Sequence, residues 1–410
     1  MSAVVASVKN ASARPFPIRV YNLTLGILQP GKKIHLDDML KKARSKSGLK
    51  DFGSEVFIEP LEKLLWSVNN EAELNPFGIM VTKIRIVNIL DNLLRAEYYF
   101  KKHPEILEAE LDPITVITGL QRTGTTYLHR SLSSLPGSRA VRSWEALNPA
   151  PYANKKNEKE FRLKLAKQSE KGLKYISKEF FAIHPVEHNA PEEEVLLLDT
   201  SFISTVAEAI MHVPTFSKWI EKTDHGPAYK QLRRMLQLLQ WQNRKKRWVL
   251  KTPHHMEFLS FLFKEFPEVK VIQTHRVPEE TVASFLSMVY YGRRMFSDRV
   301  SLESVRDHWF KKMQRMVEQA MRFREDGQHD AAFLDVYYRD IVGDHEVVLK
   351  KVIQHGAWDV AEGETITERQ KKNKYGAHSY GLGDFGLTRE EVRKGFSGYY
   401  ERYFSELGDI

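Results

Sequence analysis

The hydrophobic pattern of the first quarter of the chain predicts helices. Between about residues 36 and 110, apolar residues recur three and four positions apart among charged ones, most clearly at 61–68 and 81–99. This spacing places the apolar side chains on one face of an α-helix. No catalytic motif stands out in this part of the chain. We therefore expect residues 1–110 to form a mainly helical segment that packs against, or covers, the rest of the protein.

From residue 112 onward, short apolar runs alternate with helical patterns. Strands are expected at 114–118, 139–142, 247–250, 269–274 and 332–336. Helices are expected at 125–135, 255–266, 279–291 and, after the last strand, through 353. Apolar strands separated by helices are typical of a parallel sheet with right-handed crossovers and helices on both faces. The pattern predicts an α/β domain over 111–410, with a mostly helical insertion at about 155–245.

The composition is that of a globular protein. The 410 residues are 42% hydrophobic, 28% charged and 11% aromatic, which excludes disorder or a coiled coil as the main state. Lys and Arg number 62 against 53 Asp and Glu, and this net charge of +9 is compatible with an anionic ligand but too small to indicate nucleic acid. Because the chain has no cysteine, disulfides, thiolate nucleophiles and cysteine-ligated metals are excluded.

No membrane span is expected. A typical apolar run, at 195–198, is bounded by Glu194 and Asp199 and falls far short of the roughly 18 residues that a span needs. The amino-terminal residues place their first charge at Lys9 and lack the order of basic, apolar and small residues of a secretory signal. We expect a cytoplasmic protein.

The stretch 117–128 carries the strongest signal of a binding site. A strand runs into a turn and then a helix, with Gly119 and Gly124 at the spacing of a loop that cradles a phosphate. Further donors come from Arg122, Thr123, Thr125 and Thr126. A Walker loop would carry Lys before Ser or Thr after the second glycine, and here two threonines stand there. The loop therefore predicts the binding of an anion without the lysine of a Walker loop. The alternative is an ordinary strand-turn-helix in which the threonines only cap the helix.

A second group of basic residues follows two other predicted strands. Lys251 comes directly after one strand and Arg276 after the next, and Ser284 lies eight residues beyond Arg276. The carboxyl ends of parallel strands meet at one edge of the sheet, so both cations are expected beside the glycine loop. Either residue alone would be read as a solvated strand end. Together with the loop they predict a cationic cleft.

These motifs resemble the sulfotransferases that use 3′-phosphoadenosine 5′-phosphosulfate (PAPS), in particular the broad, largely bacterial branch that acts on small molecules and lipids. The likeness runs in order over 95–404, through 103–106, 119–126, 144–145, 251–255, 276–284, 338–342, 378–380 and 384–386. It implies a P-loop-like three-layer fold with a central parallel sheet. It also implies that residues 122–126 hold the 5′-phosphosulfate, that Arg276 and Ser284 hold the 3′-phosphate, and that Tyr338 helps to cradle the adenine.

The reaction expected from this resemblance is an in-line attack by an acceptor oxygen on sulfur. Lys251 would stabilise the bridging oxygen that leaves with the nucleotide, while the loop amides and Arg122 hold the equatorial oxygens. No metal is required. We expect transfer to a hydroxyl of a small, partly apolar acceptor, which includes lipids, with no role for nucleic acid.

Three residues are candidates for the general base that removes the acceptor proton. They are Glu145, which lies about as far beyond the loop as a catalytic glutamate in related sulfotransferases, His188 in the insertion, and His255 in the Lys251 motif. A structural role remains open for each. The acidic run 192–194 is expected to form the first turn of a helix rather than a metal site.

Three alternatives compete with a sulfotransferase. His184, Glu187 and His188 match the H-x-x-E-H pattern of some zinc hydrolases, although Pro185 disfavours the helix that this pattern needs. A small-molecule kinase would share the fold and the loop but lacks the Walker lysine here. A nucleotide-binding interaction protein would bind the nucleotide without transferring a group.

Overall fold

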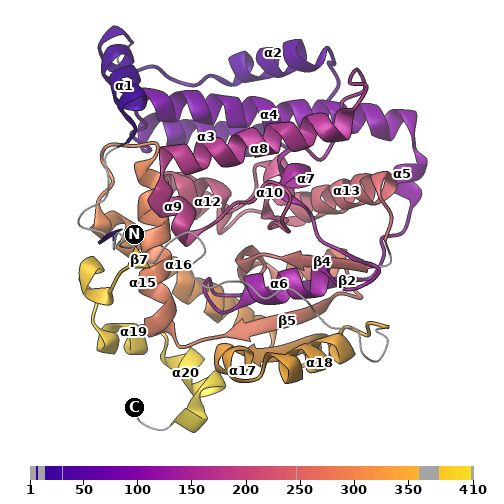
Figure 1. The fold of residues 1–410 in the computed structure, drawn as a ribbon, viewed down its shortest axis with the longest axis vertical. Coiled ribbons are helices and arrows are strands. Elements are labelled where there is room, and N and C mark those ends of the chain that lie inside the picture. The colour runs from indigo at the N-terminus through magenta and orange to yellow at the C-terminus, as the bar shows by residue number, and fades with distance from the viewer. Residues whose placement is uncertain (1–5, 8–13, 30, 246, 360–377, 408–410) are drawn as a thin grey trace, which may run out of the picture.

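A five-stranded parallel sheet forms the lower part of the molecule in Figure 1, and helices fill the upper part. The computed structural model describes residues 6–7, 14–29, 31–245, 247–359 and 378–407. The strand order is β3-β4-β2-β5-β6, and every neighbouring pair is parallel. The strands are β2 (Ile114–Gly119), β3 (Ser138–Arg139), β4 (Arg247–Lys251), β5 (Lys270–His275) and β6 (Phe333–Tyr337). A separate parallel pair joins β1 (Ala6–Ser7) to β7 (His378–Ser379).

Both faces of the sheet are buried. Every residue of β2 is buried, and alternate residues point to opposite faces. Val116 lies in the main core with Leu250 and Val271, whereas Ile117 lies in a second core with Leu128. The second core packs under α6 (Thr125–Ser133), α17 (Tyr338–Gly343) and α18 (His345–His355). The expected three-layer α/β fold with a central parallel sheet is confirmed.

The amino-terminal helices lie at the end of the molecule away from the sheet (Figure 1). They are α1 (Phe16–Leu28), α2 (Leu36–Ser47), α3 (Ile58–Asn70), α4 (Pro76–Lys102) and α5 (Glu105–Glu108). The longest of them, α4, begins where the Asn75 side chain accepts the backbone N–H of Gly78. None of the helices in the described ranges is both long and apolar enough to cross a lipid bilayer.

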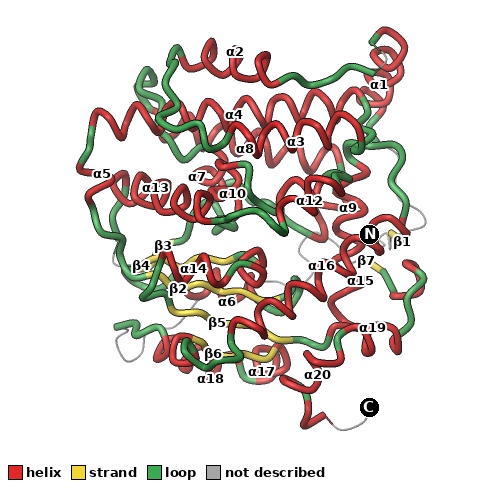
Figure 2. Tube along the Cα trace, turned by 180° about the vertical axis from the view of Figure 1, so that it is seen from behind, coloured by secondary structure: helices red, strands yellow, loops and turns green. Residues whose placement is uncertain are grey.

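The residues between β3 and β4 are mostly helical and lie between the amino-terminal helices and the sheet (Figure 2). These helices are α7 (Ser143–Leu147), α8 (Glu158–Ile176), α9 (Lys178–Ile183), α10 (Val195–Leu198), α11 (Val206–Ile210), α12 (Pro214–Ile220) and α13 (Gly226–Gln242). After β4 come the 3₁₀-helix η3 (Pro253–Glu257), α14 (Leu259–Glu265), α15 (Pro278–Arg294) and α16 (Leu302–Phe323). The chain ends with α19 (Arg389–Gly395) and α20 (Ser397–Tyr403). The 360–377 stretch, which precedes the last motifs, lies outside the described residues.

Two predicted elements differ from the structure. The strand expected at 139–142 has only two residues, because the chain turns at Arg142 to begin α7 and the Glu145 carboxylate accepts the Arg142 N–H. The helix expected at 255–266 is broken at Phe258, whose φ of −131° lies outside helical geometry. Two side chains of η3, on the amino-terminal side of that break, are held by distant parts of the chain: His255 by Glu194 and Tyr229, and Glu257 by Lys312.

Candidate functional site

The glycine loop is a tight turn packed against the end of β5. Its backbone has positive φ at Gly119 (154°), Arg122 (70°) and Gly124 (94°). A Cβ atom on Gly119 would collide with the hydroxyl and carbonyl oxygens of Thr274. The hydroxyl of Thr123 is buried and hydrogen-bonded to the Thr274 hydroxyl at 2.6 Å. Thr123 therefore fixes the loop to the sheet, and its hydroxyl is already engaged inside the protein.

Gly124 ends the loop and begins helix α6. A Cβ there would lie 2.7 Å from Ile341 Cδ1 and 3.4 Å from the Tyr338 ring, so the position excludes a side chain. Thr125 is buried and Thr126 is exposed in the first turn of α6. The first N–H groups of a helix have no partners within it and carry partial positive charge. The loop thus presents backbone amides and a hydroxyl to an anion at this helix end.

Arg276 joins the loop to the residue that follows β6. Its Nη1 donates to the carbonyl of Arg122 at 2.9 Å, and its Nε donates to Glu280 at 2.7 Å. The guanidinium lies 3.9 Å from the centroid of the Tyr338 ring. The structure therefore brings together the Arg122 backbone, Arg276 and Tyr338; the strand pattern had placed the loop and Arg276 at this edge, and the family resemblance had added Tyr338.

Ser284 lies in the second turn of α15, beyond Arg276. The residue is fully buried, and its Oγ has no hydrogen-bond partner among the described residues. A buried hydroxyl without a partner costs free energy, so it marks a place where a polar ligand atom is favourable. No direct hydrogen bond joins Ser284 to Arg276 in the described chain.

Lys251 lies at the carboxyl end of β4, beside β2. Its Nζ is 2.5 Å from Glu193 Oε1, and its backbone N–H donates to Glu194 Oε2 at 2.7 Å. Only 7% of the Lys251 side chain is exposed. The Thr118 hydroxyl donates to the Thr252 carbonyl at 2.9 Å and ties the two strand ends together. The lysine is thus held in a fixed position beside the glycine loop.

The acidic run at 192–194 has a different role from the one expected. These residues precede α10, and the side chains of Glu193 and Glu194 bind groups at the end of β4 instead of capping a helix turn. Glu194 is fully buried. Neither contact was predicted from the sequence, where the only signal was a run of three glutamates directly before the apolar residues 195–198.

His255 is enclosed by polar partners. Its Nε2 lies 2.8 Å from Glu194 Oε1 and its Nδ1 lies 2.7 Å from the Tyr229 hydroxyl. The ring is fully buried. Because both nitrogens are engaged, this geometry favours a positioning role for His255 over proton transfer.

Glu145 lies at the amino terminus of α7. Its Oε1 accepts from Arg139 at 2.6 Å and its Oε2 accepts the backbone N–H of Arg142 at 2.9 Å. The side chain is 5% exposed. Both oxygens are therefore occupied within α7 and β3, and the structure describes no contact between Glu145 and Lys251.

His188 lies in the loop after α9, beside α6. Its Nδ1 is 2.6 Å from Glu170 Oε2, and a third of its side chain is exposed. The preceding residue, Glu187, pairs with Arg130 of α6 at 3.0 Å. His188 is therefore an imidazole oriented by a carboxylate, which is the arrangement of many general bases.

The zinc pattern does not form a metal site. His184 is the residue at which α9 ends, and Glu187 and His188 lie in the loop beyond it with separate partners. Within the described ranges, no group of three or more His, Asp and Glu side chains is arranged to hold a metal ion.

His254, three residues after Lys251, is a further candidate that was not predicted from the sequence. The ring is buried, its Nδ1 lies 3.3 Å from the Thr205 hydroxyl, and its Nε2 has no partner in the described chain. Burial holds the pKa of His254 well below its usual range, so the ring is neutral. Its place three residues after Lys251, in the same motif as His255, was the available signal.

Comparisons with known proteins identify the family. The model of the sulfotransferase family matches residues 113–362. The crystal structure of sulfotransferase STF1 from Mycobacterium tuberculosis is similar, with 28% sequence identity and a TM-score of 0.79 over 89% of this chain and 99% of that one. Sulfotransferase STF9 from Mycobacterium avium has 22% identity and a TM-score of 0.77, over 90% and 96% of the two chains. No curated protein sequence matches the chain. With the family model covering more than half of its length, the chain belongs to the sulfotransferase family of enzymes.

Proposed function

We propose that this enzyme transfers a sulfuryl group from PAPS to a hydroxyl of a small, partly apolar acceptor. The observation that carries the proposal is the convergence of four features at one edge of the sheet. The glycine loop follows β2, and Lys251, Arg276 and Tyr338 end or follow β4, β5 and β6. Ligands of open α/β sheets bind at this edge.

The donor set fits the chemistry of PAPS, which carries a 5′-phosphosulfate, a 3′-phosphate and an adenine. The loop amides and Arg122 supply donors for the first group. Arg276, together with the unpartnered hydroxyl of buried Ser284, supplies donors for the second. The Tyr338 ring lies near Gly124 of the loop and the Arg276 guanidinium, and it supplies an aromatic face for the adenine. When bound, PAPS provides a sulfur joined through oxygen to a good leaving group.

Lys251 is the residue that we propose to stabilise the leaving oxygen. Its ammonium is almost completely buried, and electrostatic interactions are stronger in such surroundings than in water. Until the donor is bound, Glu193 balances its charge. The lysine is therefore already positioned and needs only to exchange one anionic partner for another.

For the general base we propose Glu193, a residue outside the three expected candidates. Glu145 and His255 have their polar atoms engaged by buried partners. The Glu193 carboxylate accepts from the Lys251 ammonium and, at 3.3 Å, from the Thr252 hydroxyl, but about a fifth of the side chain is exposed, more than for Glu145 or His255. Once Lys251 turns to the donor, this carboxylate is left within reach of an acceptor hydroxyl. His188, oriented by Glu170, is the second candidate.

A radiolabelled transfer assay tests the proposal. PAPS carrying labelled sulfur is incubated with sterols, phenols and long-chain alcohols, and labelled products are separated from donor. The native enzyme and a control with an exposed lysine changed, Lys264→Met, are expected to label an acceptor at similar rates, whereas Lys251→Met should do so about 10²- to 10³-fold more slowly. Full transfer by Lys251→Met would contradict the role of this lysine. Magnesium-dependent ATP turnover would instead favour the kinase alternative.

A further inference from the structure

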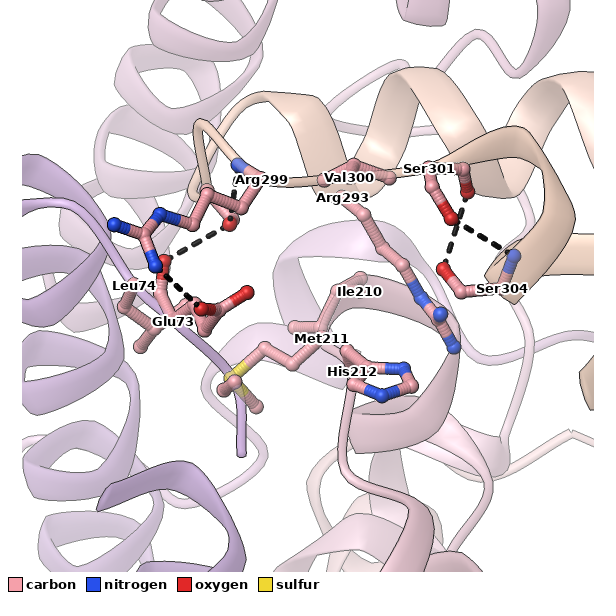
Figure 3. Close-up of a pocket in the computed structure, with 12 residues that line it drawn as sticks. Glu73, Leu74, Ile210, Met211, His212, Arg293, Arg299, Val300, Ser301 and Ser304 are labelled. Atoms are coloured by element: carbon pink, nitrogen blue, oxygen red, sulfur yellow. Dashed lines mark hydrogen bonds and ion pairs between the residues drawn. The ribbon is translucent and has the colours of Figure 1, made fainter. Parts of the chain in front are cut away.

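A second pocket lies between the amino-terminal helices and the long helices α15 and α16 (Figure 3). Its volume is about 240 Å³. The chain segments around it are the α3–α4 connection, the end of α11, the last turn of α15 and the start of α16. Its lining residues are Ala72, Glu73, Leu74, Ile210, Met211, His212, Arg293, Ser297, Arg299, Val300, Ser301 and Ser304. No residue of the glycine loop or of the Lys251 motif belongs to this lining.

Arg293 is the buried cation of this pocket. The residue is 2% exposed, and in Figure 3 its guanidinium extends toward His212. Its Nη2 donates to the carbonyl of Glu208 at 2.7 Å, but Nε and Nη1 have no partner among the described residues. Burial lowers the pKa of Arg293 to about 10, against the opposing effect of Glu208. A guanidinium has five N–H donors, so this buried cation lacks most of its hydrogen bonds.

The nearby carboxylates do not accept hydrogen bonds from Arg293 Nε or Nη1. Glu208 forms ion pairs with His308 at 2.9 Å and with Lys312 at 3.3 Å. Although burial raises its pKa, these cations hold it down at about 2, so Glu208 is ionised, with Oε2 hydrogen-bonded to His308 and Oε1 in the ion pair with Lys312. Glu73, in the pocket wall, pairs with Arg299 at 3.0 Å. Neither carboxylate forms a hydrogen bond with Arg293, so Nε and Nη1 have no acceptor among the described residues.

The rest of the pocket has two further properties that define its ligand. Five of its lining residues have aliphatic or thioether side chains: Ala72, Leu74, Ile210, Met211 and Val300. His212 adds no charge, because burial and the nearby Arg293 lower its pKa. The amino terminus of α16 adds positive potential, with Ser301 as its cap. The pocket thus combines a buried cation with five apolar lining residues, and the Glu73–Arg299 pair and three serines complete its wall.

We propose that this pocket binds a small apolar carboxylate, anchored by Arg293. Its volume is about eight times the roughly 30 Å³ that one water molecule occupies in the liquid, which suits an acid of the size of benzoate. Helix α11 separates it from the reaction site, because Thr205 at one end contacts His254 and Ile210 at the other lines the pocket. Five helical residues span about 8 Å. The carboxylate site is therefore distinct from the donor site and goes beyond the proposed function.

Calorimetric titration with benzoate tests the proposal. The native enzyme is expected to bind one benzoate, with or without saturating 3′-phosphoadenosine 5′-phosphate. Arg293→Met is expected to weaken binding by about tenfold or more, because it removes charge-assisted hydrogen bonds. The matched control is Arg294→Met, the same change at the next residue, which does not line the pocket. It should bind benzoate as the native enzyme does.

Three titration results would overturn the proposal. The first two are no binding of benzoate by the native enzyme and equal binding by the native enzyme and Arg293→Met. The third is competition between benzoate and the nucleotide, which would place the acid at the glycine loop. Retained nucleotide binding shows that Arg293→Met is folded. Crystals of the native enzyme soaked with 4-iodobenzoate test the site independently of any variant. The iodine signal should lie in the pocket, and a signal elsewhere would contradict the assignment.

Discussion

Lys251 and Glu193 form an ion pair at the carboxyl end of β4, with Nζ 2.5 Å from Oε1. The two residues are 58 positions apart and come from the central sheet and from the helical insertion. Both side chains are largely buried, with 7% and 21% of their surfaces exposed. The pair therefore joins the proposed donor-binding edge to the segment that lies over it, and it places a cation and a carboxylate at one point.

Removal of the Lys251 ammonium should slow the chemical step more than it weakens donor binding. We expect Lys251→Met to lower the single-turnover rate of transfer by about 10²- to 10³-fold, the usual effect of losing one group that stabilises developing negative charge. Binding of the product nucleotide should change little, because Arg276 and the loop remain. A rate within threefold of the native value, roughly 0.7 kcal/mol, would contradict the leaving-group role.

The Glu193→Gln variant should also be slow, by about 10²- to 10⁴-fold, if Glu193 removes the acceptor proton. The amide keeps the shape of the side chain, and its oxygen can still accept a hydrogen bond from Lys251. Rapid-quench measurement with labelled PAPS checks this prediction. A native rate for Glu193→Gln together with a slow His188→Gln would transfer the role to His188.

Glu145→Gln is the matched comparison, and here the expected loss is in stability. The change leaves buried Arg139 without its anionic partner, and breaking a buried ion pair costs about 3–5 kcal/mol. Urea unfolding should show this loss, while the transfer rate of the folded fraction stays close to native. A stable but inactive Glu145→Gln would show instead that Glu145 takes part in the chemistry.

Gly124→Ala should lower the stability of the loop and weaken the binding of the nucleotide. A non-glycine residue at a φ of 94° costs about 1–3 kcal/mol, and the new methyl group would lie 2.7 Å from Ile341 Cδ1. Gly172→Ala in α8 is the control, because nothing lies within 4 Å of its added Cβ. In that helix the change should raise the free energy of unfolding by about 0.5–1 kcal/mol. Equal effects of the two changes would contradict the loop geometry.

Stability should fall in mild acid because of buried neutral histidines. Burial lowers the pKa of His225 from 6.5 to about 4. Between these values the unfolded chain binds a proton that the folded protein does not, so the free energy of unfolding decreases as the pH falls through this window. For His225 alone the loss amounts to about 3 kcal/mol over the window. In His225→Phe the slope of stability against pH should be lower by up to about 1.4 kcal/mol per pH unit. Denaturation at several pH values checks this, and an unchanged slope would contradict the buried neutral state.

The sequence predicted which residues lie at the carboxyl edge of the sheet, because local hydrophobic patterns show where each strand ends. Lys251 and Arg276 come directly after short buried strands, and parallel strands in one sheet end at the same edge. The same logic placed the glycine loop at this edge, and the structure adds that β2, which leads into the loop, lies between β4 and β5. Each of these placements depends on hydrophobic period and chain order, which a single sequence displays.

The partners of these residues did not follow from the sequence, because they depend on tertiary contacts. Nothing local to Glu193 and Glu194 indicates that they meet the end of β4, and a helix first turn was the better local interpretation. The same contacts explain the broken helix after β4. His255 is held by Glu194 and Tyr229, and Glu257 is paired with buried Lys312, so the partners of η3, on the amino-terminal side of Phe258, override the helical pattern.

The most direct test of the account compares two nucleotides on the native enzyme and on Arg276→Gln. Calorimetric titrations would use 3′-phosphoadenosine 5′-phosphate and adenosine 5′-phosphate, which differ only in the 3′-phosphate. The account predicts that the native enzyme binds the 3′-phosphorylated nucleotide at least about tenfold more tightly, and that most of this preference is lost in Arg276→Gln. Equal affinity of the native enzyme for the two nucleotides, or no binding of either, would contradict the account.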